Sequence, residues 1–337
     1  MTEIERQNPE IRTLLSAAKR PFNINASSWE KEAPLLTLLH FADLHSDAEN
    51  LKRIVEFMNG LKDQFEDAVC SGDMVRKYYH TGYGFWHESG ADPILVTVGN
   101  HDALNNPHYD WNDLIPEAQQ AATFIEPYVP FWGDVEYTPG TTYYCKRYEA
   151  QKVDLITLNT QLFESEKGPE EAFLKEKLDR ALREDRGVVI LLHDTSSAKQ
   201  TVVPCHYSSL DGAPSEPCGP GLKKSTQKAV QDFIDAGGDF LCYLAGHSHR
   251  DFLCYDPAFP RQYSLLAPAA SLEKGLRQGD SARVRGEKSQ DALQFVVFDR
   301  RSKLVKVIRV GADRDHYLRS RRILVFRYTT GEIVYEE

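Results

Sequence analysis

The chain has 337 residues, which is long enough for one large domain or two average ones. Charged residues make up 27% and aromatic residues 11% of the sequence, a composition that excludes a fibrous or low-complexity chain. The formal net charge is −10, so the overall electric field does not attract nucleic acid or an anionic membrane surface.

The first thirty residues are mostly polar. The opening MTEIERQNPE contains neither the basic nor the apolar region of a signal peptide. No stretch of the chain reaches the roughly 20 apolar residues that a membrane span needs. We therefore expect an N-terminal segment over residues 1–34, no membrane partner and a cytoplasmic location.

The first apolar run, Leu35 to Phe41, has the length of a buried strand. Asp43 and His45 follow it closely. Ser46-Asp47-Ala48-Glu49 then has the S-x-x-E form of a helix-capping box, and apolar residues at helical spacing continue as far as Leu61. This part of the chain predicts a strand, a loop and a helix, in that order.

The same order of elements returns along the chain. Further strands are predicted at residues 67–70, 94–98, 153–158, 188–192 and 240–245, and helices at residues 169–182 and 225–236. Alternating strands and helices indicate a largely parallel central sheet with helices outside it. Ligands bind at the carboxyl ends of the strands in such sheets, and the polar clusters of this chain lie at those ends.

The C-terminal part has a different pattern. Residues 273–291 are polar and have little strand character. Beyond them, strands are predicted at residues 293–298, 303–310, 322–328 and 332–335. We expect these strands to be antiparallel and to complete the fold, so the expected organisation is an N-terminal segment (1–34), a main domain (35–272) and C-terminal strands (273–337).

Six cysteines are spread along the chain. Because no secretion signal is seen, reduced thiols explain them better than a disulfide framework does. Cys205, His206 and Cys218 share one segment and could hold a structural zinc ion, but that segment contains no C-x-x-C pair. Plain loop cysteines are the favoured interpretation.

Eight polar residues follow the predicted strands: Asp43, His45, Asp73, Asn100, His101, His193, His247 and His249. Carboxylate oxygens, amide oxygens and imidazole nitrogens bind divalent cations of intermediate hardness. Residues two apart in an extended segment point the same way, so a D-x-H or H-x-H pair can converge on one centre. Glycines before three of these residues would let the backbone approach closely. The set is large enough for two cations.

The order of these residues resembles a known signature. D-x-H at Asp43, G-D at Asp73, G-N-H-D at Asn100, an isolated His193 and G-H-x-H at His247 follow one another as in the calcineurin-like metallophosphoesterases. Five ordered blocks are far more specific than any single block. The resemblance implies an α/β fold, a four-layer sandwich of two mixed β-sheets flanked by helices, with residues 35–272 as the metallophosphoesterase catalytic domain.

The resemblance also implies a role for each residue. Asp43, His45 and His249 would hold the first metal, Asp73 would bridge both metals, and Asn100, His193 and His247 would complete the second site. His101 would be the catalytic histidine and, with Asn100, would lie beside the substrate phosphate. Asp194, which follows His193, is expected to be a local cap or an outer-shell group.

The implied reaction is hydrolysis of a phosphomonoester or phosphodiester, with nucleotides among the candidates. A metal-bound hydroxide would attack, and His101 would donate the proton. Two cations about 3.5–4 Å apart neutralise a phosphate and lower the pKa of a bound water toward about 7. The implied cofactors are two divalent ions (Mn, Fe, Zn or Ni), and the implied partner is a small phosphoester substrate.

One block departs from the pattern of many protein phosphatases in the family. Those proteins have G-D-x-x-D, whereas here Arg76 stands where the second Asp would orient the catalytic histidine. Asp102 is the nearest alternative for that role. Arg76 could contact the substrate phosphate as a fixed cation, and a solvated arginine is the alternative interpretation.

The substrate is not defined by these motifs. The aromatic segment Tyr78–His87 and the long segment Val202–Gly221 both leave the expected active face and could line a pocket, or could simply pack onto the domain. A nuclease of the same fold is one alternative function, and the acidic balance argues against nucleic acid as a partner. A protein-binding scaffold, like the retromer subunit of this family, is another, but it need not keep a complete set of ligands. The oligomeric state remains open.

Overall fold

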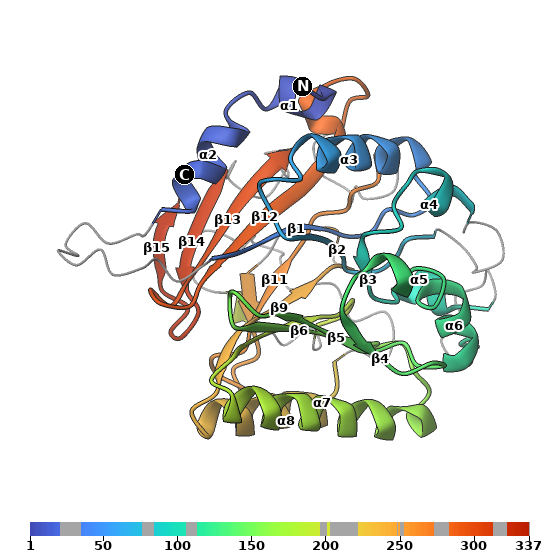
Figure 1. Ribbon diagram of the computed structural model, residues 1–337, viewed down its shortest axis with the longest axis vertical. Coiled ribbons are helices and arrows are strands. Elements are labelled where there is room, and N and C mark those ends of the chain that lie inside the picture. The colour runs from blue at the N-terminus through green and yellow to red at the C-terminus, as the bar shows by residue number, and fades with distance from the viewer. Residues whose placement is uncertain are drawn as a thin grey trace.

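The computed structural model describes residues 1–20, 35–75, 84–105, 113–195, 222–247, 249, 253–272, 283–312 and 322–336, and the backbone of residues 201–202. Two β-sheets lie face to face and helices cover both outer faces (Figure 1). The four-layer sandwich of two mixed sheets that the family resemblance implies is thereby confirmed.

The first sheet has seven strands within the described ranges, in the order β15-β14-β13-β12-β1-β2-β3. Their bounds are β1 Leu36–Phe41, β2 Asp67–Cys70, β3 Leu95–Val96, β12 Ala292–Asp299, β13 Leu304–Gly311, β14 Ile323–Arg327 and β15 Ile333–Glu336. β1, β2 and β3 are parallel, and the remaining pairs are antiparallel. All residues of β1 and β12 are buried because both faces of the sheet are covered.

The second sheet has eight strands in the described part of the chain, in the order β4-β5-β6-β7-β9-β11-β10-β8. Their bounds are β4 Val135–Tyr137, β5 Tyr144–Tyr148, β6 Val153–Thr157, β7 Gly187–Leu191, β8 Thr201–Val202, β9 Asp239–Ala245, β10 Leu253–Tyr255 and β11 Tyr263–Leu266. The central strands β6, β7, β9 and β11 are parallel, and antiparallel strands flank them. The prediction of one largely parallel central sheet was therefore wrong. The structure has two sheets, and the antiparallel strands at their edges make both of them mixed.

Helices cover the outer faces of the two sheets. Their bounds are α1 Glu3–Gln7, α2 Ile11–Ala18, α3 Ala48–Gly60, α4 Gly84–Glu88, α5 Asn100–Ala103, α6 Glu117–Phe124, α7 Lys167–Arg183 and α8 Lys224–Asp235, with 3₁₀ turns at Val129–Phe131, Glu164–Glu166 and Lys288–Gln290. α1, α2 and α3 lie over the first sheet, and α7 and α8 lie over the second (Figure 1).

The N-terminal segment contains two helices that were not predicted from the sequence. Thr2 and Glu5 form a capping box at the start of α1. Ile4, Ile11 and Leu15 are buried on the first-sheet side of the molecule, where α1 packs on α3 and α2 packs on β13. The signal was present as T-x-x-E followed by apolar residues at helical spacing.

Two element ends differ from the prediction. α3 is capped by Asp47, whose side chain accepts a hydrogen bond from the Asn50 amide, and not by Ser46. Ser46 has a positive φ of 64° and lies outside the helix. β3 has only two residues because it pairs with only Val69 and Cys70 of β2.

The C-terminal strands β12 to β15 are antiparallel, and β12 pairs with β1 in the first sheet. The domain boundaries at residues 34 and 272 stay a prediction. None of the helices within the described ranges combines the length and apolar character needed to cross a bilayer.

Some predictions lie on residues that the structure does not describe. These are Arg76, residues 78–83 of the aromatic segment, residues 203–221 of the long segment and the zinc hypothesis at Cys205, His206 and Cys218. Of the described cysteines, Cys70, Cys145, Cys242 and Cys254 are buried.

Candidate metal centre

The predicted ligands come from both sheets and meet between them. Asp43 and His45 follow β1, Asp73 follows β2, and Asn100 begins α5 just after β3. The second sheet contributes the others, with His193 following β7 and the pair His247 and His249 following β9. Since these strands present their carboxyl ends at one edge of the sandwich, side chains from distant parts of the sequence converge there.

One cluster consists of Asp43, His45, Asp73 and His249, whose ligand atoms all lie within 4.8 Å of one another. The Nε2 atoms of His45 and His249 are 3.1 Å apart. Nε2 of His249 is also 3.4 Å from Oδ1 of Asp43. Nitrogen and oxygen atoms that face a common point at such distances could hold one cation.

A second cluster consists of Asp73, His193 and His247. Asn100 joins it, because its Oδ1 lies 2.8 Å from both Nε2 of His193 and Nδ1 of His247. Nε2 of His193 is 3.3 Å from Oδ1 of Asp73. Asp73 is therefore the one residue that belongs to both clusters of the described chain.

The donor atoms fit two divalent cations. Asp43 and Asp73 are 0% and 1% exposed, and a buried carboxylate is costly unless positive charge or hydrogen bonds compensate it. Oδ2 of Asp73 and Nδ1 of His45 are buried and have no hydrogen-bond partner among the described residues. Oxygen and imidazole donors without protein partners are what a site for cations of intermediate hardness requires.

Burial and neighbouring charges shift the pKa values of the clustered side chains. Burial works to raise the pKa of Asp73, but the neighbouring His193 and His101 outweigh it and hold this pKa well below its usual range. Burial works to lower the pKa of His193, but Asp73 outweighs it and raises this pKa well above the usual range. Burial lowers the pKa of His45 to about 4, so its ring is neutral and able to bind a cation.

The backbone at these residues is unusual. Asp43, His45, Asp73, His247 and His249 all have φ between 51° and 67°, which is the left-handed region that non-glycine residues rarely adopt. Each such residue costs of order 1–3 kcal/mol, and residues of this kind cluster at functional sites. The chain therefore holds the five side chains in place at the expense of stability.

Glycines make the close packing of these loops possible. A Cβ atom on Gly99 would overlap the amide nitrogen and Oδ1 of Asp73. A Cβ atom on Gly246 would lie 2.6 Å from Cβ of Ala42 and 2.9 Å from Oδ2 of Asp43. The expected close approach of the backbone is thus present at both positions.

Further residues contact the predicted ligands and were not predicted from the sequence. Nδ1 of His193 lies 2.6 Å from the Ser71 carbonyl oxygen, which leaves Nε2 facing the cluster. The Ser71 hydroxyl lies 2.5 Å from Nε2 of His40, and burial lowers the pKa of His40 to about 3. The His247 amide donates to both carboxylate oxygens of Asp43, at 3.1 and 3.0 Å, and so connects the two clusters. His40 stood within the apolar run of the first strand, where nothing distinguished it from a core residue.

His101 lies at the open side of the centre. Its amide donates to Oδ1 of Asp73 at 2.8 Å, and its ring centroid is 4.7 Å from that of His45. Its side chain is 18% exposed, whereas Asp73 and His193 are fully buried. The His101 imidazole is therefore partly exposed, whereas these two neighbours are not.

Both carboxylate oxygens of Asp102 accept hydrogen bonds from backbone amides. Oδ1 accepts a hydrogen bond from the Val75 amide and Oδ2 from the Gly99 amide, each at 2.9 Å. Burial, followed by the charge of Asp73, raises the pKa of Asp102 to about 7. The carboxylate that the structure sets beside the His101 ring is that of Asp73, with Oδ2 3.9 Å from Nε2. Asp102 as the orienting acid stays a prediction, and the two hydrogen bonds show that it ties together the loops after β2 and β3.

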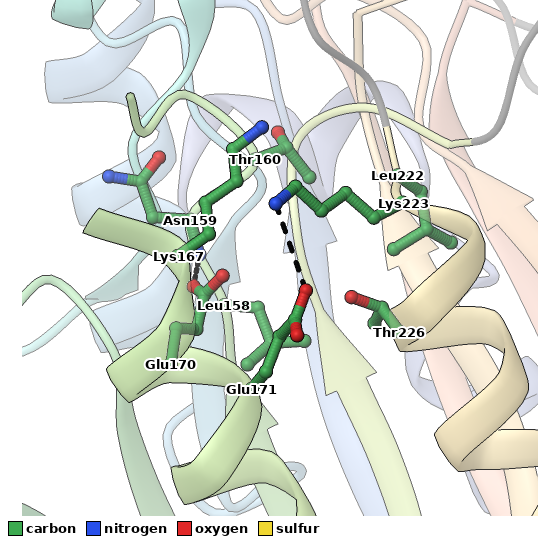
Figure 2. A pocket seen from close by; sticks show the side chains of 9 residues that line it. All are labelled: Leu158, Asn159, Thr160, Lys167, Glu170, Glu171, Leu222, Lys223 and Thr226. Atoms are coloured by element: carbon green, nitrogen blue, oxygen red, sulfur yellow. Dashed lines mark hydrogen bonds and ion pairs between the residues drawn. The ribbon is translucent and has the colours of Figure 1, made fainter. Parts of the chain in front are cut away.

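Neither of two cavities in the described part of the structure is lined by residues of the metal clusters. Figure 2 shows one between α7, α8 and the segment after β6, where a dashed line joins Lys223 to Glu171. Its volume is about 10 Å³, which is room for about one water molecule and too little for a phosphoester. The other, of about 270 Å³, is lined by Leu35 and Arg300 among others, at the amino end of β1.

Comparisons with known proteins bear on the family and the fold of the chain. A model of the calcineurin-like phosphoesterase family matches residues 36–251, which is more than half of the chain. A dimetal phosphatase from Danio rerio has a similar structure, with a TM-score of 0.50 and 11% identity over 85% of this chain and 99% of that chain. A purple acid phosphatase from yellow lupin (Lupinus luteus) seeds has a TM-score of 0.49 and 13% identity over 92% of this chain and 54% of that chain. No curated protein sequence matches the chain. The match to the family model shows that the chain belongs to the calcineurin-like phosphoesterase family.

Proposed function

We propose that the protein is a phosphoesterase that depends on two divalent cations and hydrolyses a small phosphomonoester or phosphodiester. One observation carries this proposal: two clusters of cation-binding side chains share Asp73. A shared carboxylate sets two cations close together, which is the arrangement that in-line displacement at phosphorus uses.

The proposed ligands follow the two clusters. Asp43, His45 and His249 hold one cation, Asn100, His193 and His247 hold the other, and Asp73 binds both. Bound there, the cations would neutralise the phosphate and make a water molecule nucleophilic at neutral pH. Mn, Fe, Zn and Ni all accept these donor types, and metal availability selects among them.

His101 is proposed to protonate the leaving oxygen. Its imidazole is partly exposed beside the buried ligands, so it can meet a substrate that approaches the clusters. The contact between its amide and Oδ1 of Asp73 fixes its backbone relative to the shared ligand. Positioned acids of this kind contribute about 10²- to 10⁴-fold to a rate.

The test is hydrolysis of bis-p-nitrophenyl phosphate and p-nitrophenyl phosphate by metal-stripped protein refilled with Mn²⁺. We expect activity on at least one ester, and its loss together with bound metal in Asp73→Ala and His249→Ala. His87→Ala is the matched control, because His87 lies in α4 and its side chain is 72% exposed. Absence of hydrolysis with Mn²⁺, Fe²⁺, Zn²⁺ and Ni²⁺ would reject the proposed function. An unchanged metal content in the two ligand variants would reject the ligand assignment.

A further inference from the structure

Asp194 is a buried carboxylate beside the second cluster that none of the five sequence blocks includes. It directly follows His193 at the end of β7 and is 1% exposed. A carboxylate at this depth requires a compensating charge or a full set of hydrogen bonds. We therefore consider which groups compensate each of its two oxygens.

One half of the Asp194 carboxylate is anchored to the protein. Oδ2 accepts a hydrogen bond of 2.5 Å from Nε2 of Gln161. Gln161 is fully buried, and its backbone amide donates to Oδ1 of Asn159 at 2.8 Å. The Asp194 amide also donates to the Thr160 hydroxyl at 3.4 Å. These contacts hold the carboxylate in one orientation, with the other oxygen directed toward the cluster.

That other oxygen faces a proposed metal ligand. Oδ1 of Asp194 accepts no hydrogen bond from the described residues and lies 3.2 Å from Nδ1 of His247. The same Nδ1 lies 2.8 Å from Oδ1 of Asn100. Oδ1 of Asp194, Nδ1 of His247 and Oδ1 of Asn100 thus lie side by side at the second cluster. Of these atoms, the Asp194 oxygen accepts no hydrogen bond from the described residues.

A cation bound at the second cluster would also prevent His247 from donating a hydrogen bond to Oδ1 of Asp194. An imidazole nitrogen that coordinates a cation carries no hydrogen. Once Nδ1 of His247 does so, it cannot serve as a donor to Asp194. The cation is then the positive group left for this buried oxygen in the described part of the chain.

We propose that Asp194 supplies a carboxylate oxygen to the second cation, alongside Asn100, His193 and His247. This inference rests on the proposed function, because it takes the second cluster to be a metal site. An added negative charge attracts a divalent cation strongly in a site shielded from water. The second cation is accordingly held more tightly than the Asp73 carboxylate, the Asn100 amide and the two imidazoles alone would hold it.

The test is a calorimetric titration of the metal-stripped protein with Mn²⁺, comparing the wild type with Asp194→Asn. Asparagine keeps the size of the side chain and an oxygen for Gln161, but it removes the charge. We expect the wild type to bind two Mn²⁺ ions, and the variant to bind the second at least tenfold more weakly with the first unchanged. Asp92→Asn is the control, because it removes a carboxylate that lies before β3 and pairs with His87. Asp194→Ser is the second variant, with the same expectation, in case the Asp194→Asn protein does not fold.

The visible spectrum of the Co²⁺-loaded protein separates a ligand from a residue that only orients His247. Loss of a ligand changes the coordination of the second Co²⁺ and therefore its spectrum, so Asp194→Asn should differ from the wild type at full loading. Identical spectra, or wild-type affinity for both Mn²⁺ ions, would overturn the inference and leave the proposed function standing. A wild type that binds fewer than two Mn²⁺ ions would reject both.

Discussion

Asp73 belongs to both clusters of the candidate metal centre through one short side chain. Its backbone has a φ of 54°, its Oδ1 accepts from the His101 amide, and Gly99 packs directly against it. A longer or displaced carboxylate could not meet both clusters with these contacts in place. The position of this one residue therefore sets the spacing of the two proposed cations.

His101 can be separated from the ligands by experiment. We expect His101→Ala to lower kcat by about 10²- to 10⁴-fold, because a proton donor is lost from the transition state. Its metal content should stay at the wild-type value, since the ligand set is unchanged. Metal analysis and p-nitrophenyl ester kinetics on the same sample measure both. Retained activity would show that another group donates the proton.

Gly99 tests the close approach of the backbone. We expect Gly99→Ala to lower both metal content and thermal stability, because its Cβ would overlap the Asp73 amide and Oδ1. Gly168→Ala is the matched control, as a Cβ there meets no atom within 4 Å. Thermal melts and metal analysis would be compared for the two variants. Wild-type metal binding in Gly99→Ala would mean that the loops after β2 and β3 can move apart without cost.

Among the elements, α7 contains a buried acid close to the carboxyl end of β6. Glu170 lies in the first turn of α7 and accepts a hydrogen bond of 2.5 Å from the Asn159 amide. Burial raises the pKa of Glu170 from 4.5 to about 8. The folded protein therefore keeps a proton on Glu170 at pH values where the unfolded chain has lost it.

Glu170→Gln should make stability less dependent on pH. Since the folded pKa lies above the unfolded one, this group's contribution to the free energy of unfolding falls as pH rises from 4.5 to about 8. The slope within that window is about 1.4 kcal/mol per pH unit. Urea unfolding at several pH values should show a flatter profile for Glu170→Gln than for the wild type. The half-exposed neighbour in Glu171→Gln is the control, and parallel profiles for Glu170→Gln and the wild type would contradict the assignment.

The whole molecule buries the carboxylates of Asp43 and Asp73 between its sheets and has a net charge of −10. Cations that bind only the folded protein stabilise it, by about 2.7 kcal/mol when their concentration is a hundred times Kd. Removal of metal should therefore lower Tm by several degrees, at about 2–4 °C per kcal/mol.

Melts of the wild type with Mn²⁺ and with a chelator test this prediction. The difference in Tm should be absent in Asp73→Ala, which lacks the shared ligand. A wild-type Tm that does not respond to metal would mean that the clusters do not bind Mn²⁺ in the folded state. An equal response in Asp73→Ala would place the stabilising ion elsewhere.

Local patterns in the sequence were enough to identify the residues that meet in the two clusters and most of the strands. Asp43 with His45, Asn100 with His101 and His247 with His249 are pairs of near neighbours, and the apolar run before each is visible without a structure. Their order carried the family resemblance and hence the sandwich. The reason is that strand burial and ligand chemistry are properties of short segments.

Long-range packing accounts for what the sequence did not show. The division into two mixed sheets depends on pairings such as β1 with β12, which join segments far apart in the chain. The His247 amide meets Asp43 across 204 positions, and Asp194 lies beside His247 although their sequence surroundings do not connect them. Such contacts form because two buried surfaces match in space, and no periodicity within either segment records its partner.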